Sequence, residues 1–575
     1  MQGGTSAKVC KLRSSLLSCG SVLSGTQLFA QSGGSGEREH FFCPILCKSR
    51  WCFYVTCTKF CAEPRLRGGV PGSRQQIYGM EGCSISVSSF SFLIFLGVIA
   101  LLHRALPARC SGGCLLLASL VYYATWAPKA LPVLLLAAVI VYVGGRIVGG
   151  RVNAGKRARL ALGISIAASF APLFLCKYLG FFVSLFQRAL HAVGISATLT
   201  APSLLVPIGI SFFTLQGVSY LVDLYRKKLS PERNFFYVLL FLCFFPSVTS
   251  GPIARAGEML PQFREKHTPT YAQVKHGCLR ILLGLFMKLM IADRIAPWIS
   301  MIYGDPVQYA GLPMWSAVFL YGMEIYADFA GYSHIALGAA ELLGVKLPEN
   351  FTLPYLSLSI REFWRRWHQS LSSWLRDYVY IPLGGSRCSK KRKYVNVLVT
   401  FACSGLWHGV GLNYIAWGLL HGIYQVLGDV LAPVREFLCR VLHLGEGSRL
   451  RTVLSTCWTF LLVDFAWILF RCSSLSNALA IVRGLCQRGT ASFAGLVAEH
   501  FVNYVPGFVL LMILLVVFLI AECYKRYTGK SLYARWLSKG AVFQWVTLFL
   551  CVMLLLVCGV YGPSYDAQSF IYSNF

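Results

Sequence analysis

Charge is scarce in this sequence, and acidic charge is the scarcest. Only 13% of the 575 residues are charged, with 23 Asp and Glu against 53 Lys and Arg, whereas 56% are hydrophobic. A soluble protein of this length needs far more charge to cover its surface. The composition therefore excludes a chain of soluble domains and indicates an integral membrane protein.

Motifs of several large enzyme classes are also missing. The sequence has no serine-hydrolase elbow, no Walker A loop, no zinc-protease H-E-x-x-H and no dinucleotide-binding glycine pattern where these could function. Triad hydrolysis, ATP-driven transport and zinc proteolysis therefore lack their parts. Any chemistry has to come from residues within or beside the apolar segments.

Long apolar runs occupy most of the chain. Each approaches or exceeds the roughly 20 residues that cross a bilayer as a helix. They are rich in Leu and do not alternate, which excludes a β-barrel. We predict an all-α polytopic membrane protein with about ten to twelve transmembrane or re-entrant helices. The runs lie at 88–103, 112–126, 131–149, 160–186, 203–225, 235–248, 278–300, 313–343, 395–431, 452–470, 506–522 and 543–561.

The net charge of +30 fits membrane topology, so we expect no nucleic-acid partner. Cytoplasmic loops of membrane proteins carry an excess of Lys and Arg. Two basic clusters flank the spans 160–186 and 203–225, whose connecting loop is nearly uncharged, so both clusters belong on the cytoplasmic side. The run Lys390–Lys393 is a third anchor on that side. The two clusters are Arg146, Arg151, Lys156, Arg157 and Arg159, and Arg226, Lys227, Lys228 and Arg233.

Residues 1–79 differ in composition from the membrane part, 80–575. They hold seven of the 22 cysteines and ten Lys and Arg against three Asp and Glu, without sustained periodicity. Five cysteines between 43 and 61 lack the C-x-x-C spacing of a zinc site, so we expect no metal there. We expect a disordered or non-native extension, and Met80 would serve as an alternative start.

One histidine stands inside a long apolar run, in Leu406-Trp407-His408-Gly409. An ionisable group at membrane depth is costly and marks a functional site by default. A helix that begins near Tyr394 places His408 roughly 20 Å from the cytoplasmic anchor. A buried neutral imidazole can act as a general base toward a hydroxyl. Gly405 and Gly409 allow close backbone approach or a local break beside it.

A second histidine, His368, lies in an aromatic and arginine-rich segment. Ser359 and Glu362 form a capping box, and apolar periodicity predicts one amphipathic helix to about Tyr378, lying along the membrane interface. His368 falls at the border of its two faces, where facing a cavity and snorkelling to the interface are equally open interpretations. Arg361 and Arg365 lie on the polar face. The apolar face holds Ile360, Phe363, Trp364, Trp367, Leu371, Trp374, Leu375 and Tyr378.

Other polar residues in apolar surroundings extend this segment to 324–422. Glu324 and Asp328 put two carboxylates four residues apart. His421 follows His408 by thirteen residues, so we expect it elsewhere around the helix bundle, with a packing role favoured.

The ordered motifs in this segment resemble the membrane-bound O-acyltransferase family, most closely its bacterial alginate O-acetylation branch. The likeness extends over roughly 85 to 575 and leaves 1–79 without a counterpart. The matching stretches are Gly251-Pro252-Ile253, Leu260-Pro261-Gln262, Asp328-Phe-x-Gly331-Tyr332-Ser333, Leu347-Pro-Glu-Asn350-Phe351, Glu362-Phe-Trp-Arg-Arg-Trp367-His368, Trp374-Leu-Arg376-Asp377-Tyr378, Ile381-Pro-Leu-Gly-Gly385 and Gly405-Leu-Trp-His408-Gly409.

The resemblance implies an O-acyltransferase of the bacterial inner membrane. It implies that His408 is the catalytic histidine and His368 its second signature position. Trp407, Trp364, Asp328, Arg361 and Arg365 become candidates for substrate binding. The expected donor is acetyl-coenzyme A or another cytoplasmic acyl thioester, with no bound cofactor or metal. The expected acceptor is a periplasmic partner protein or a cell-surface polysaccharide.

Two alternative functions use the same residues. A proton-coupled transporter would employ both histidines as a relay and predicts internal repeats, of which the sequence shows none. A non-catalytic scaffold would tolerate replacement of His408.

Overall fold

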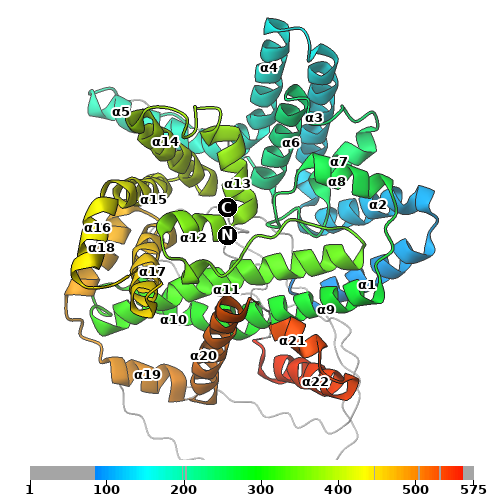
Figure 1. The fold of residues 1–575 in the computed structure, drawn as a ribbon. Helices are drawn as coiled ribbons and strands as arrows, with labels where there is room; N and C mark the ends of the chain where they lie inside the picture. Colours follow the sequence, from blue (N-terminus) through cyan, green and yellow to red (C-terminus); the bar gives the residue numbers. More distant parts are fainter. Residues whose placement is uncertain are drawn as a thin grey trace, which may run out of the picture. The chain divides into compact units, whose positions relative to one another are not determined.

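Apolar helices dominate the computed structural model, which describes residues 85–560 except 197, 201, 203, 446, 503–504 and 530–531. Every regular element in those residues is a helix (Figure 1). The all-α membrane class is therefore confirmed. The predicted extension 1–79 lies outside the described residues.

The first group of helices follows the order of the apolar runs. Loops and the π-helix Phe174–Tyr178, between α4 and α5, separate its members. The helices are α1 (Phe90–Ala105), α2 (Ala108–Trp126), α3 (Leu131–Arg151), α4 (Lys156–Leu173), α5 (Leu179–Ala192), α6 (Ile210–Tyr225), α7 (Phe235–Cys243) and α8 (Ala256–Arg264).

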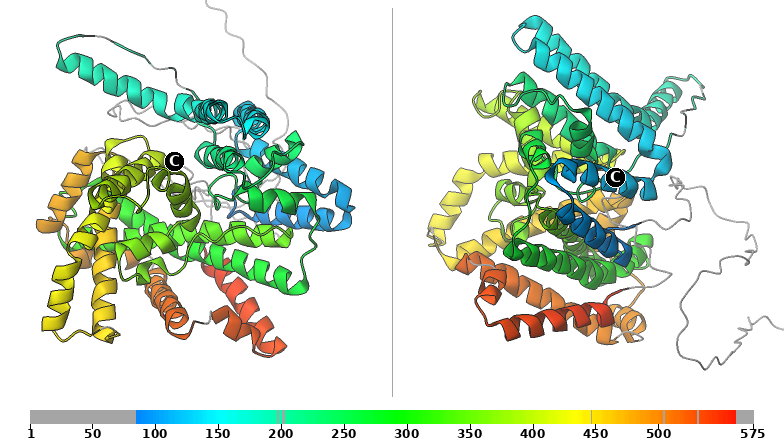
Figure 2. Two further views of the ribbon diagram at one scale, coloured as in Figure 1. Left: turned by 45° about the horizontal axis from the view of Figure 1, so that its top comes forward. Right: turned by 90° about the vertical axis from the view of Figure 1, so that its right-hand side faces the viewer.

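The middle of the described part is a close helix pair, α9 (Tyr271–Phe286) and α11 (Leu312–Leu342), which run side by side in Figures 1 and 2. Gly284 faces Gly331, and Gly277 faces Gly338, so that a side chain at any of the four would press on the partner helix's backbone. Small residues let membrane helices approach closely. The glycine pairs therefore let α9 and α11 approach closely, and 23 of the 31 residues of α11 are buried among its neighbouring helices.

The remaining helices carry the candidate site and surround it. The site helices are α12 (Ile360–Arg366), α13 (Gln369–Leu375), α14 (Lys390–His408) and α15 (Leu412–Val430). The others are α10 (Asp293–Gly304), α16 (Ala432–Val441), α17 (Arg449–Arg471), α18 (Leu475–Cys486), α19 (Phe493–Val502), α20 (Val505–Thr528), α21 (Leu532–Leu537) and α22 (Ala541–Cys558).

Fewer helices cross a membrane by length and composition than the ten to twelve segments predicted. Within the described residues four qualify, Pro128–Arg151, Lys156–Ala192, Arg449–Arg471 and Ala541–Cys558, and a fifth if the bent pair α15 and α16 is one span. Several apolar runs are split. The run 278–300 is divided by a π-helix at Met287–Ala292, and the run 395–431 breaks between His408 and Leu412. The prediction included re-entrant segments, because apolarity alone does not distinguish a continuous span from a broken one.

Candidate active site

His408 is the last residue of α14. The helix opens at Ser389, whose hydroxyl accepts from the Arg392 amide, and ends where Gly409 turns to an extended conformation. The predicted helix and the predicted break are therefore confirmed. A side chain at Gly405 would overlap the Tyr414 carbonyl, which shows the close backbone approach expected there.

Aromatic rings surround the buried His408 imidazole, which is 1% exposed. Ring centroids lie 4.8 Å away for Trp407, 5.0 Å for Trp417 and 5.3 Å for Phe470, all in edge-on arrangements. These rings come from α14, α15 and α17. The imidazole is therefore held in an apolar box that three helices build.

His368 sits at a break between α12 and α13, where one continuous helix was predicted. Its backbone has a φ of 41°, a left-handed conformation that costs a non-glycine residue about 1–3 kcal/mol. Hydrogen bonds to the preceding loop replace the helical ones: the Gln369 amide donates to the Asn350 carbonyl at 2.9 Å, and the Thr352 amide donates to the Arg366 carbonyl at 3.0 Å. The prediction of an unbroken helix was wrong because these tertiary bonds win over local periodicity.

The two halves of the predicted interfacial helix also face different surroundings. Phe363 and Trp364 of α12 pack in one aromatic cluster, and Leu371 and Trp374 of α13 pack in another. His368 itself is completely buried, so the snorkelling interpretation is wrong.

Asn350 connects His368 to two other motif segments. Its Oδ1 atom lies 3.3 Å from His368 Nδ1 and accepts from the Ser370 hydroxyl at 2.6 Å, while its Nδ2 donates to Ser333 at 3.1 Å. Because an amide oxygen only accepts, this contact favours the imidazole tautomer with the proton on Nδ1. The Ser370 hydroxyl also accepts from the Ile253 amide at 3.0 Å. Four motif segments thus converge on His368.

An ion pair fixes the loop that carries Asn350. Both carboxylate oxygens of Glu349 accept from Arg280 of α9 at 2.6 Å. Burial tends to raise the pKa of Glu349, but the hydrogen bonds and charge of Arg280 outweigh it and hold the pKa below its ordinary value. The loop is therefore anchored beside the histidine by a charge-assisted bidentate contact.

The Trp407 ring contacts both histidines. Its ring lies 4.8 Å from the His408 ring and 6.0 Å from the His368 ring, measured between centroids. Two histidines forty residues apart in the sequence are therefore both buried and both contact the same tryptophan ring.

The profile of the membrane-bound O-acyltransferase family matches residues 219–440, which include both histidines. A peptidoglycan O-acetyltransferase of Helicobacter pylori is 34% identical over 429 residues, covering 68% of this chain and 77% of that protein. This chain belongs to the membrane-bound O-acyltransferase family. It is a multi-pass membrane O-acyltransferase, as the motifs predicted.

Other relatives of this acyltransferase have different named acceptors. A probable alginate O-acetylase AlgI of Pseudomonas aeruginosa is 34% identical over 436 residues, covering 75% of this chain and 80% of that protein. A teichoic acid D-alanyltransferase of Bacillus subtilis is 30% identical over 274 residues, covering 46% of this chain and 68% of that protein. The relatives of this chain are thus named for the transfer of acetyl and of alanyl groups.

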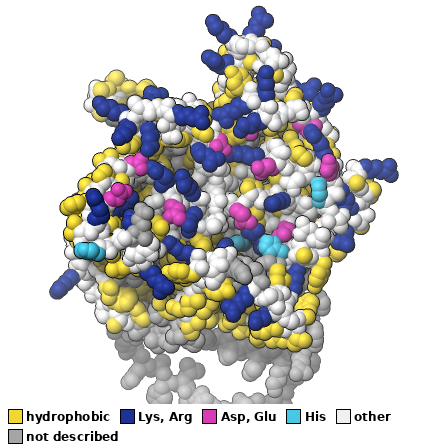
Figure 3. All heavy atoms as spheres, in the orientation of Figure 1, with side chains coloured by type: hydrophobic (Ala, Val, Ile, Leu, Met, Phe, Trp, Pro, Cys, Tyr) yellow, Lys and Arg dark blue, Asp and Glu magenta, His cyan; other side chains and the backbone are white. Residues whose placement is uncertain are grey.

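The predicted substrate-binding arginines lie apart from the histidines of the acyltransferase. Arg361 and Arg365 are exposed on α12. Lys and Arg side chains are spread widely over the face of the molecule that Figure 3 shows. Arg361 is hydrogen-bonded to Asp429, which Lys393 also binds at 2.7 Å. Their role in substrate binding stays a prediction. As exposed charges, they would attract an anionic donor rather than contact it beside the histidines.

Asp328 is 2% exposed and pairs with a lysine. Its carboxylate lies 2.6 Å from Lys288 Nζ, and Asp293 lies 2.9 Å from the same nitrogen. Two carboxylates around one ammonium form a buried ion cluster within the scaffold. Substrate binding by Asp328 stays a prediction, and its observed contact is structural.

Trp364 and His421 contact each other, whereas Trp407 contacts His368 and His408. The Trp364 indole donates to His421 Nδ1 at 3.3 Å. His421 lies in the same aromatic cluster as His408, with Trp417 5.0 Å from one ring and 5.2 Å from the other. The ring contacts agree with a packing role, although His421 is nearer to His408 than expected.

Two residues at the site were missed by sequence reasoning. Lys177 Nζ donates to the Trp407 carbonyl at 3.1 Å, and the Tyr178 hydroxyl donates to the Leu406 carbonyl at 2.8 Å. A signal was present, because a lysine inside the apolar run 160–186 is costly in a membrane. The hydropathy of the run 160–186 predicts a span and does not reveal the partners of this lysine.

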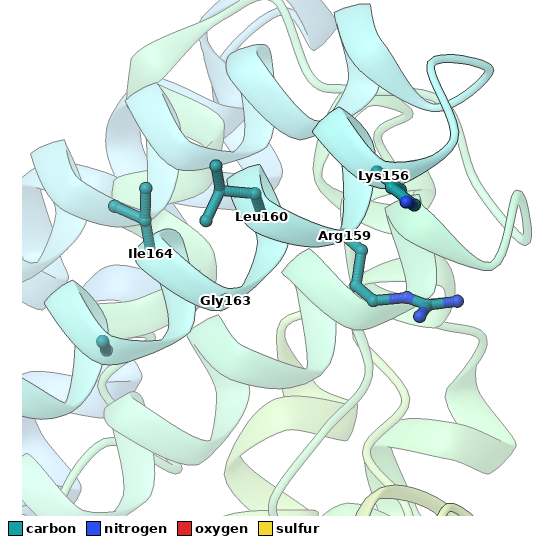
Figure 4. Close-up of a pocket in the computed structure, with 6 residues that line it drawn as sticks. Lys156, Arg159, Leu160, Gly163 and Ile164 are labelled. Atoms are coloured by element: carbon teal, nitrogen blue, oxygen red, sulfur yellow. The ribbon is translucent and has the colours of Figure 1, made fainter.

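A surface groove on α4 lies outside this site. Lys156, Arg159, Leu160, Gly163, Ile164 and Ala167 line it (Figure 4), and none of them is a site residue.

Among the described residues no group of three His, Cys, Asp or Glu side chains could hold a metal ion.

Proposed function

We propose that this acyltransferase moves an acyl group, expected to be acetyl, from a cytoplasmic thioester to a hydroxyl of a cell-surface polysaccharide. Acetyl-coenzyme A is the proposed donor, and the proposed location is the bacterial inner membrane. The names of the relatives support an extracytoplasmic polymer, since they specify peptidoglycan, alginate and teichoic acid. The group would reach the polymer directly or through a periplasmic partner protein.

The observation that carries this proposal is the buried His408, whose neighbour Trp407 contacts both its ring and that of His368. The His408 imidazole would take the proton of the acceptor hydroxyl. The hydroxyl oxygen would then attack the thioester carbonyl carbon, forming the C–O bond. The C–S bond breaks, and the proton passes from His408 to the departing thiolate. Such general base catalysis contributes about 10²–10⁴-fold to a rate.

His368 would act beside this reaction rather than in place of His408. Its contact with Asn350 sets the orientation and tautomer of the ring. A fixed imidazole at this position could orient the donor carbonyl or pass a proton. Much of the rate of an acyl transfer comes from holding the two reactants together, and the rigid aromatic walls suit that task.

The outer basic groups would attract the anionic donor. Arg365 and Arg361 lie on the exposed side of α12, and the Lys390–Lys393 run begins α14, the helix that ends at His408. Attraction of this kind acts over about 10 Å and weakens with salt. It would bring an anionic thioester to the face from which α14 leads to the site.

Replacement of His408 tests the proposal. In cells that express His408→Ala at the normal protein level, base-labile acetyl esters on surface polymers should fall to the level of cells without the protein. His191→Ala is a matched control, because this histidine is exposed near the end of α5. Persistence of the esters in His408→Ala would reject the mechanism and favour a scaffold. Uptake of labelled acetyl groups by the cells, without the formation of esters on surface polymers, would favour a transporter.

A further inference from the structure

The C-terminal end of α14 is held by side chains from another helix. The last carbonyls of an α-helix have no partner within the helix. Here the Leu406 carbonyl accepts from Tyr178 at 2.8 Å and the Trp407 carbonyl accepts from Lys177 at 3.1 Å. Both donors lie on the π-helix Phe174–Tyr178, a wide turn of a kind that occurs often at functional sites.

Lys177 also reaches the Trp407 ring through Ser211 of α6. Lys177 Nζ donates to the Ser211 hydroxyl at 3.2 Å, and the Trp407 indole donates to the Ser211 carbonyl at 3.3 Å. Trp407 is therefore held at both ends, by its carbonyl and by its indole nitrogen. Since the Trp407 ring contacts both imidazoles, this arrangement fixes a wall that the two histidines share.

The burial of the Lys177 side chain is energetically costly. Its side chain is 9% exposed within a helix that is long and apolar enough to cross the membrane. Burying an ammonium group costs more than packing an apolar side chain of similar length. A cation at the C-terminal end of a helix recovers part of that cost through the helix dipole. Packing alone does not account for a lysine at this place.

We propose that Lys177 is a positioning residue of the acyl-transfer site, which holds the Trp407 carbonyl and thereby fixes His408 between its aromatic walls. This inference rests on the proposed function. It assigns to Lys177 the placement of the base and no contact with the substrate. Small misplacements of a catalytic group cost about 100-fold in rate, so the effect should appear in kcat.

The test compares Lys177→Met with Lys177→Arg in membranes of cells that make the full chain, with acetyl-coenzyme A as the donor. Lys177→Met removes the donor group, and kcat should fall by about 100-fold with the KM for the donor nearly unchanged. Lys177→Arg keeps a donor and should restore a measurable part of kcat. Lys156→Met, the same exchange at the exposed start of α4, should behave as the parent protein.

Protein level and thermal stability are measured for every variant. Unchanged kcat in Lys177→Met, or an equal loss in Lys177→Met and Lys177→Arg at normal protein level, would overturn the inference. If Lys177→Met does not accumulate, Lys177→Gln decides, because its side chain stays polar but is too short to hold the Trp407 carbonyl. A lowered kcat at unchanged KM then supports the inference, and an unchanged kcat overturns it. His408→Ala in the same membranes separates the two proposals, because an active His408→Ala rejects the proposed function itself.

Discussion

Two buried lysines in this protein lie on π-helices and have different surroundings. Lys288, on Met287–Ala292, is 2.6 Å from Asp328 and 2.9 Å from Asp293. Lys177, on Phe174–Tyr178, donates to a backbone carbonyl and a serine hydroxyl. The first lysine neutralises carboxylates inside the scaffold, whereas the second supports the backbone beside His408. A buried charge is thus understood from its acceptors rather than from its depth.

The largest expected effect is on stability, at Lys288. Lys288→Met leaves two buried carboxylates without their cation, which costs about 3–5 kcal/mol for a broken buried pair. The protein should fail to accumulate or should unfold at a much lower temperature in detergent, as measured by thermal unfolding. Lys156→Met again serves as the control, since Lys156 is exposed. A stable Lys288→Met would remove the contrast between the two lysines.

The next effect concerns the close helix pair α9 and α11. Lys288 lies on the π-helix that follows α9, and Asp328 lies on α11. Gly331→Val places a branched side chain against the Gly284 carbonyl and should destabilise the protein by about 1–3 kcal/mol through overpacking. Thermal unfolding and the yield of folded protein measure it. Gly163→Val on α4, where added atoms meet open space, is the matched control. Equal stability of both variants would contradict the observed helix contact.

Asn350 should show the opposite balance, with catalysis affected more than stability. Asn350→Ala removes the acceptor that orients His368, and kcat should fall by about 10- to 100-fold. The lost hydrogen bonds should cost only about 1–3 kcal/mol of stability. Initial rates in membranes, normalised to protein level, measure the effect. A variant with the parent's kcat would show that the Asn350 contact does not matter to the reaction.

His421 should give the smallest effect. His421→Phe keeps an aromatic ring in the cluster and removes one acceptor for the Trp364 indole, a loss of about 1 kcal/mol. Surface ester formation should stay within about threefold of the parent at normal protein level, because the proposal gives this ring a packing role. If His421→Phe abolished ester formation, His421 would have to join the catalytic pair.

Local sequence features predicted the backbone near His408 well, because residues close together in the chain decide it. The helix that ends at His408 and the break at Gly409 follow from residues within a few positions of each other. The break at His368 does not, because the carbonyl of Asn350 and the amide of Thr352 decide it from another segment. The pairing of Asp328 with Lys288 likewise depends on the packing of α9, its π-helical extension and α11. Such contacts leave no periodic signal.

The same limit applies to the count of membrane passes and to Lys177. A hydropathy run reports composition, and it does not reveal that Met287–Ala292 widens into a π-helix or that the chain turns after His408. The proposed roles of the histidines come from the family motifs, because no spacing could establish them. Lys177 was visible as a single charge, yet its partners, at Ser211 and Trp407, are known only from the fold.

The glycine pairs of α9 and α11 have a consequence for register. Gly277 and Gly284 are seven residues apart, as are Gly331 and Gly338, so sliding one helix by seven residues would still bring one glycine opposite another. The close backbone contact alone therefore tolerates two alignments. Only the native one brings Lys288 to Asp328. The buried ion pair thus adds to the preference for the native alignment, beside the helix whose Arg280 anchors the loop of Asn350.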